Sequence, residues 1–145
     1  MENFIIYPAL LFPAIPLMMT NFTHRYNSCA ALVRKIHAEI IEKKIDTKDV
    51  MGRRYIAQIK TLTYRIKLIK LIQTLSGLAL FTNLLTIFFG YIEKSNISLN
   101  CFGIAVGLFG IAIILFIIEV QMSARALEYH LTDLKDKEDN IFNVA

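Results

Sequence analysis

The sequence predicts an all-α integral membrane protein in which three transmembrane helices form one domain and the first two continue into a cytoplasmic, antiparallel helical hairpin. Three observations predict this fold. Of the 145 residues, 55% are apolar and only 19% are charged, and the mean hydropathy of +0.49 is high for a soluble domain. The charged residues are missing from three long stretches, and most basic residues fall in the connection between the first two stretches.

The three apolar stretches have the lengths that membrane helices require. The third has eighteen consecutive residues without a charge, from 101 to 118, and such a helix is about 27 Å long, close to the roughly 30 Å of a bilayer core. The second has twenty-two uncharged residues, and the first has sixteen, with three prolines and no preceding basic residue. That missing basic residue argues against a secretory signal. We expect spans at about residues 4–21, 71–92 and 101–122.

The distribution of charge predicts the orientation of these spans. The connection over residues 22–70 holds 12 of the 16 basic residues against four acidic ones, a net charge of +8. The outer loop expected at 93–100 has one acidic and one basic residue. Because basic loops stay in the cytoplasm, we expect residues 22–70 and the tail at 123–145 on the cytoplasmic side, and the amino terminus and the loop outside.

A narrow apolar stripe runs along each half of the basic connection. Its residues recur at alternating intervals of four and three, the spacing of helices that pack along one seam. We expect two helical arms, at about 22–45 and 48–70, that pair as a coiled-coil hairpin and continue the first two spans. In the alternative, both arms lie on the membrane with their basic residues on anionic headgroups, although surface helices usually have a wider apolar face. The stripe consists of Phe22, Tyr26, Cys29, Val33, Ile36 and Ile40, and then Ile59, Leu62, Ile66 and Ile69.

Small and polar residues gather on one face of the second span. An unpaired amide near the middle of a span costs about several kcal/mol, so this face must meet protein or water rather than lipid. It either packs against another helix or lines a pore, and packing is the commoner use. The residues of this polar face are Ser76, Ala79, Asn83, Thr86 and Gly90.

The third span has two opposite faces of small residues, which allow helices to approach closely. Three helices of one chain cannot cover both faces as well as the polar face of the second span. We therefore expect a homo-oligomer, with either the glycine face or the alanine face at the subunit boundary. The glycine face consists of Gly103, Gly107 and Gly110, and the alanine face includes Ala105 and Ala112.

Glu119 ends the third apolar stretch. A carboxylate at this depth is either an ion or proton site or an interfacial group paired with a nearby cation. The second situation is the commoner one. For Glu119 we expect pairing with Arg125, Lys67 or Lys70.

The sequence has no catalytic signature and no cofactor motif. His24, His37 and His130 lack a His or Cys one helical turn away, no glycine-rich phosphate loop is present, and two cysteines are too few for a disulfide framework. We expect a protein that is not an enzyme and binds no metal or cofactor. The basic connection does not indicate nucleic acid, because basic charge beside a bilayer is what the membrane orientation requires.

Five short motifs lie at the ends of the expected spans and along the hairpin. They are Pro8-Ala9-Leu10-Leu11, His24-Arg25-Tyr26, Val33-Arg34-Lys35-Ile36, Tyr64-Arg65-Ile66 and Ile118-Glu119-Val120. In these motifs the chain resembles a family of small bacterial membrane proteins, domain of unknown function 2721, over about residues 5 to 127. The resemblance implies three spans with a cytoplasmic hairpin in a bacterial inner membrane, and it implies no activity.

Two functions agree with these patterns. The first is a homo-oligomeric membrane anchor or interaction module whose basic hairpin binds an anionic lipid or a cytoplasmic protein, and the small size and missing chemistry favour it. The alternative is a small oligomeric ion channel whose pathway the polar face lines. The hairpin contacts would be Arg34, Lys35, Arg53, Arg54, Lys60 and Arg65, and the pore residues Ser76, Asn83, Thr86, Gly90 and Glu119.

Overall fold

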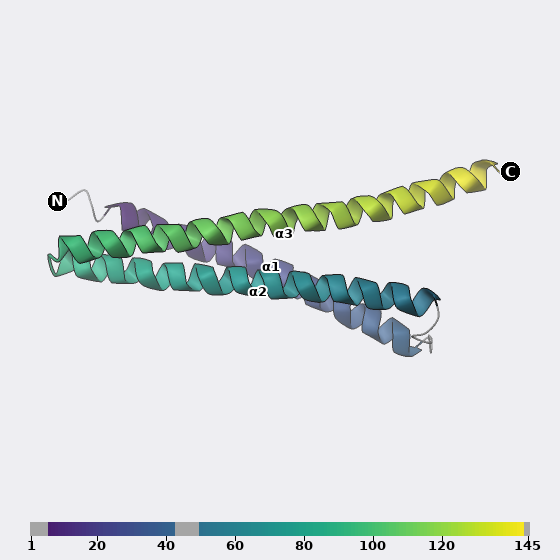
Figure 1. Ribbon diagram of the computed structural model, residues 1–145, viewed down its shortest axis with the longest axis horizontal. Helices are drawn as coiled ribbons and strands as arrows, with labels where there is room; N and C mark the ends of the chain where they lie inside the picture. The colour runs from purple at the N-terminus through teal and green to yellow at the C-terminus, as the bar shows by residue number, and fades with distance from the viewer. Residues whose placement is uncertain (1–5, 43–49, 144–145) are drawn as a thin grey trace.

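The computed structural model describes residues 6–42 and 50–143, with residues 51, 127 and 129–143 described in their backbone only. Over this part of the chain there are three long α-helices, α1 (Ile6–Glu42), α2 (Val50–Tyr91) and α3 (Ser95–Asn143). They lie lengthwise beside one another (Figure 1), and α2 packs against both α1 and α3. The prediction of an all-α fold is confirmed.

Each helix contains a segment that is long and apolar enough to cross a membrane. The helical stretches that contain these segments are Ile6–Glu42, Gly52–Tyr91 and Ser95–Ala126. Their outer faces carry large apolar side chains, of which Leu17, Phe81 and Ile114 are each more than half exposed. An apolar outer face of this kind matches hydrocarbon rather than water.

Two of the helices continue from their apolar segments into basic segments without a break. α1 passes through Pro13 and Pro16, although each proline lacks an amide hydrogen and leaves one carbonyl without its donor. Both prolines are exposed on α1, and membrane helices tolerate such prolines where local adjustments of the helix or polar side chains satisfy the freed carbonyl groups. The first arm is thus part of α1 and the second is part of α2, while the expected arm ends at residues 45 and 48 lie outside the described residues.

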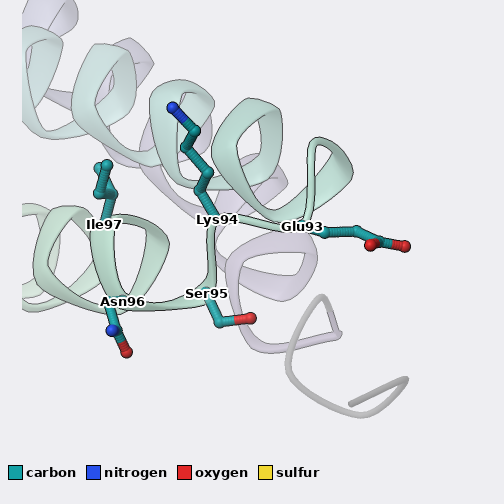
Figure 2. A pocket seen from close by; sticks show the side chains of 5 residues that line it. All are labelled: Glu93, Lys94, Ser95, Asn96 and Ile97. Carbon is teal, nitrogen blue, oxygen red and sulfur yellow. The ribbon is translucent and has the colours of Figure 1, made fainter.

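The turn between α2 and α3 is shorter than the loop expected at 93–100. The amide of Glu93 donates to the carbonyl of Gly90 (3.2 Å), the amide of Lys94 donates to the carbonyl of Phe89 (3.1 Å), and Glu93 has a φ of 61°. This pair of bonds around one left-handed residue closes the end of a helix. α3 then begins at Ser95, and Figure 2 shows Asn96 and Ile97 in its first turn. The expectation of a loop to residue 100 was wrong because the first turn of α3 is polar and lies outside the apolar stretch.

The buried residues recur every seven positions on the two outer helices. On α1 they are Pro8, Ile15, Phe22 and Cys29, and on α3 they are Ser98, Ala105, Ala112 and Glu119. An interval of seven keeps one stripe of a helix facing the same neighbour along its length. The central helix, α2, has buried residues toward both neighbours, namely Leu62, Ile69, Ile72, Ser76, Ala79, Asn83 and Thr86.

The helices separate at one end of the molecule. Figure 1 shows the carboxyl-terminal part of α3 leaving α1 and α2, which stay together. The last buried residue of α3 among those whose side chains the structure describes is Glu119. The point of separation therefore lies just beyond Glu119.

Candidate functional site

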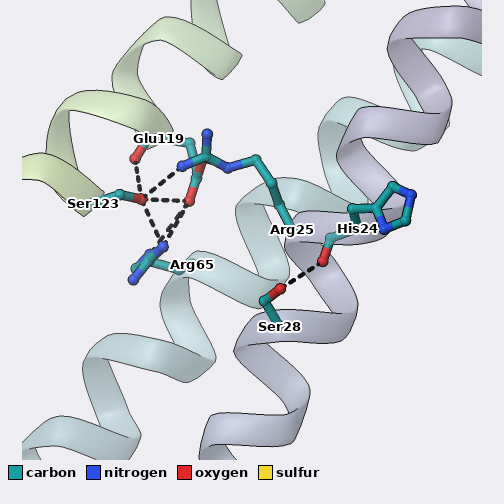
Figure 3. Close-up of polar contacts among 6 residues, drawn as sticks. All are labelled: His24, Arg25, Ser28, Arg65, Glu119 and Ser123. Atoms are coloured by element: carbon teal, nitrogen blue, oxygen red, sulfur yellow. Dashed lines mark hydrogen bonds and ion pairs between the residues drawn. The ribbon is translucent and has the colours of Figure 1, made fainter.

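A buried carboxylate joins all three helices at the point where α3 leaves the other two. The Glu119 side chain, on α3, is fully buried, whereas the side chains of Arg25 on α1 and Arg65 on α2 are 28% and 16% exposed. Arg65 donates to Oε1 of Glu119 from Nε (3.3 Å) and from Nη2 (3.1 Å). Nε of Arg25 forms an ion pair with Oε2 at 3.0 Å, although no hydrogen bond of good geometry reaches Oε2. Figure 3 shows the two guanidinium groups converging on the carboxylate.

Ser123 completes this group, which we call the charge cluster (Arg25, Arg65, Glu119 and Ser123). Its hydroxyl accepts hydrogen bonds from Nη2 of Arg65 (2.6 Å) and Nη2 of Arg25 (3.1 Å). The same hydroxyl lies 2.9 Å from both Oε1 and the backbone carbonyl of Glu119, and its single hydrogen is donated to one of them at a time. One serine oxygen thus positions both arginines.

Aromatic packing supports the cluster on its apolar side. The rings of Phe22 on α1 and Phe116 on α3 lie 5.0 Å apart, and the Arg25 guanidinium lies over the Phe116 ring at 5.5 Å. A cation above an aromatic face is attracted by the negative face of the ring. The Arg25 side chain is therefore held between the ring and the carboxylate.

The predicted pairing of Glu119 was wrong. Its cations are Arg25 and Arg65 rather than Arg125, Lys67 or Lys70, which are all exposed. Arg65 was expected on the basic outer surface, but its side chain turns inward because the buried carboxylate of α3 faces it. This geometry agrees with the alternative in which the Glu119 carboxylate is paired with a nearby cation. The cations differ from the three that were expected.

The composition of the cluster limits its chemistry. Two guanidinium groups and one carboxylate leave a net charge of +1. No His, Cys or second carboxylate joins Glu119, and the described residues contain no group of three or more such side chains that could hold a metal ion. The charge cluster can hold an anion, and it lacks the ligands for a cation.

The polar face of α2 is enclosed within the chain. Ser76 and Asn83 are completely buried and Thr86 is 1% exposed, while Gly90 is half-buried. Nδ2 of Asn83 donates to the carbonyl of Pro8 on α1 (2.9 Å), and the Ser98 hydroxyl of α3 donates to the carbonyl of Thr86 (2.7 Å). These contacts join the polar face of α2 to α1 and to α3 within one chain.

Two buried oxygens on this face have no partner among the described residues. They are Oγ of Ser76 and Oδ1 of Asn83. They lie seven positions apart on α2 and therefore belong to different layers of the packing. The structure does not bring them together into one site.

The two small-residue faces of α3 have different environments. Ala105 and Ala112 are fully buried within the single chain, so the alternative that placed the alanine face at a subunit boundary was wrong. Gly103 and Gly107 are exposed and Gly110 is half-buried. A Cβ atom added at any of these glycines would meet no atom within 4 Å. The glycine face is open.

The remaining basic residues of the expected hairpin surface point outward. The exposed ones are Arg34, Lys35, Arg53, Arg54 and Lys60.

Comparison with known proteins identifies the family. The sequence matches the family described as "Protein of unknown function (DUF2721)" over residues 5–129. The chain belongs to the DUF2721 family. The match extends from the start of α1 through the charge cluster on α3, and it bears out the resemblance noted from the motifs. No curated protein and no solved structure matches the chain.

The motifs that suggested DUF2721 contain three of the four cluster residues, Arg25, Arg65 and Glu119. Analysis of the residues alone missed the roles of Arg25, Arg65 and Ser123. One signal could have found Arg25. Arg25 follows the first apolar stretch by a few residues, and Arg65 precedes the second apolar stretch by a few residues. Glu119 directly follows the third apolar stretch. In helices of alternating direction, these positions lie at the same depth.

Proposed function

We propose that this DUF2721 protein is a homo-oligomeric membrane anchor that presents a basic helical hairpin to an acidic surface of a cytoplasmic protein. The proposal places the apolar segments of the three helices in a bacterial inner membrane. The amino terminus and the α2–α3 turn lie outside, and the hairpin and the end of α3 lie in the cytoplasm. The membrane itself supplies the other partner.

The observation on which this proposal rests is the continuity of α1 and α2. Each runs as one helix from an apolar segment into a basic one. A helix that crosses the membrane and does not bend cannot also lie flat on its surface, so continuity favours arms that stand off the membrane. The basic side chains on these arms then face the cytoplasm rather than the lipid headgroups.

Charge indicates the kind of partner. Arg34 and Lys35 on α1, and Arg54 and Lys60 on α2, are exposed. Positive residues on an outer surface steer and orient partners of opposite charge. We therefore infer an acidic protein surface as the ligand of the hairpin.

The glycine face of α3 supports self-association. Gly107 is exposed in the middle of an apolar segment, with open space where a Cβ would lie. Surfaces of small residues let two membrane helices approach closely enough for their backbones to pack. Because the alanine face is already buried against the rest of the chain, the glycine face is the one left for a second copy.

The channel alternative gains no support. Its pathway required Ser76, Asn83 and Thr86 to face a water-filled space, and these residues are buried between helices of a single chain. A second function is therefore not proposed.

One experiment in the native membrane tests both the membrane topology and the contact with a cytoplasmic protein. A photo-crosslinking amino acid is placed at single positions of the chain. We expect discrete protein adducts from Lys35 and Lys60 on the hairpin, and none from Asn96 at the outer turn. Reversing the charge of Arg34 and Arg54 to Glu should remove the adducts, whereas Lys94→Glu should not. Adducts from Asn96, or adducts that survive the hairpin reversal, would contradict the proposal.

An ion-flux measurement in proteoliposomes provides the complementary test. We expect no flux from a purified oligomer of defined mass. Flux that Asn83→Leu abolishes, with the mass unchanged, would establish the channel instead.

A further inference from the structure

The charge cluster has hydrogen-bond donors that the protein does not use. Each guanidinium group offers five N–H donors. Arg25 donates one hydrogen bond from Nη2 and forms its ion pair through Nε, and Arg65 donates from Nε and Nη2. Among the described residues, neither Nη1 group donates a hydrogen bond, and in Figure 3 one terminal nitrogen of each arginine has no dashed line. Both groups also keep some exposed surface, 28% for Arg25 and 16% for Arg65.

Among the residues whose side chains the structure describes, one positive charge of the cluster has no counter-ion. Two arginines face a single carboxylate, and all three groups are mostly or wholly removed from solvent. An uncompensated charge in such a place is unfavourable unless water or an anion neutralises it. The missing component is one negative charge that can accept hydrogen bonds from guanidinium groups.

The surroundings indicate where that anion comes from. The cluster lies where the apolar segments of the three helices end, and Ile117 and Ile118, directly before Glu119, are each close to half exposed. Leu71 on α2 is likewise half exposed. In a bilayer, phosphate groups lie at this level and acyl chains lie beside such side chains. A free phosphate ion would use the arginines but leave the apolar surface uncovered, whereas a phospholipid uses both.

We infer that Arg25 and Arg65 form a binding site for the phosphate of an anionic phospholipid in the cytoplasmic leaflet. Arginine suits this role because its guanidinium group always stays charged and forms short, charge-assisted hydrogen bonds with phosphate oxygens. Glu119 and Ser123 act as positioning residues, since they hold both guanidinium groups and leave the Nη1 groups to the lipid. The inference rests on the proposed function in one respect, the placement of this end of the helices at the cytoplasmic face.

Charge balance makes the site selective among lipids. A phosphatidylglycerol headgroup has one net negative charge and neutralises the net +1 of the cluster. A phosphatidylcholine headgroup has no net charge and leaves the cluster positive. The site is therefore expected to prefer the anionic lipid.

Native mass spectrometry of the full-length protein in detergent measures this preference. The protein is titrated with phosphatidylglycerol and, separately, with phosphatidylcholine, and the bound lipids are counted. Arg65→Gln removes the excess charge while the Arg25–Glu119 ion pair remains. We expect it to lower the preference for phosphatidylglycerol about fivefold, the effect of about 1 kcal/mol for a basic residue near the membrane surface. Glu119→Gln removes the negative charge of the cluster, so its net charge rises from +1 to +2, while the amide oxygen can still accept from Arg65. The preference should rise instead.

Arg125→Gln is the matched control, because it removes the same charge from an exposed position on α3 outside the cluster. The control should keep the wild-type preference. Arg25→Gln serves as a second test if Arg65→Gln loses its helical circular dichroism. Equal losses in Arg65→Gln and Arg125→Gln would overturn the inference, and so would complete displacement of phosphatidylglycerol by millimolar inorganic phosphate.

These outcomes are separable from a failure of the proposed function. If the crosslinking experiment places the hairpin outside the cell, both conclusions fail. If it places the hairpin in the cytoplasm and the lipid preference is absent, only the lipid site fails. If lipid preference is present but the hairpin gives no protein adduct, the site stands and the anchor function does not.

Discussion

Arg65 on α2 donates two hydrogen bonds to Oε1 of Glu119 on α3, and the same helices are joined again by the hydrogen bond from Ser98 to the carbonyl of Thr86. The two contacts are 21 residues apart on both helices. The register of α2 against α3 therefore stays the same over three intervals of seven residues, from the turn between these helices to the charge cluster. One end of this helix pair is fixed by the turn and the other by the cluster.

Removing the carboxylate of the cluster should destabilise the fold. Glu119→Ala leaves Arg25 and Arg65 facing each other without a counter-charge, and loss of one member of a buried ion pair costs about 3 kcal/mol. Thermal unfolding in detergent, followed by circular dichroism, should show a clear fall in Tm. Glu42→Ala removes an exposed carboxylate from α1 and should leave Tm unchanged. Equal Tm values for the two variants would argue against a structural role for the cluster.

The hydrogen bond from Asn83 to the carbonyl of Pro8 should contribute to the packing of α1 on α2. Asn83→Leu keeps the same branched arrangement of side-chain heavy atoms but removes the donor, and an interhelical hydrogen bond in a membrane protein is worth about 1 kcal/mol. We expect a small decrease in Tm. Thr74→Val is the control, because its hydroxyl bonds only within α2, to the carbonyl of Lys70. A higher Tm for Asn83→Leu would show that burial of the Asn83 amide destabilises the protein by more than its hydrogen bond stabilises it.

Periodicity and charge predicted the helices well, because both act along a single helix. Cys29 and Leu62 lie on the predicted stripes and are buried, as an interval of seven requires. The charge cluster was not predicted, because the sequence fixes the depth of Arg25, Arg65 and Glu119 but not the rotation that turns them toward one another. The start of α3 was missed for a different reason. Its first turn is polar, and an apolar stretch marks the hydrocarbon region rather than the helix end.

The turn between α2 and α3 should become more stable if its left-handed residue is replaced by glycine. Glu93 has a φ of 61°, a conformation that an L side chain disfavours and glycine adopts freely. Glu93→Gly should raise stability by about 0.5 to 1 kcal/mol, observed as a higher Tm. Asn96→Gly, placed inside the first turn of α3, should lower Tm, because glycine weakens a helix. A lower Tm for Glu93→Gly would mean that the Glu93 side chain makes a contact whose contribution to stability exceeds the strain of its left-handed backbone.

Adding a large side chain to α3 should have opposite effects on its two small-residue faces. Ala112 is completely buried against the other helices, so Ala112→Leu overfills the packed interior and should cost about 1 to 3 kcal/mol, lowering Tm. Gly107 is exposed, and a Cβ there would meet no atom within 4 Å. Gly107→Leu should therefore leave Tm close to that of the wild type but shift the mass in detergent, measured by light scattering, toward the monomer. An unchanged mass for Gly107→Leu would show that a second copy, if it binds, uses another face. A dissociated but fully stable Ala112→Leu protein would mean that the alanine face lies between subunits after all.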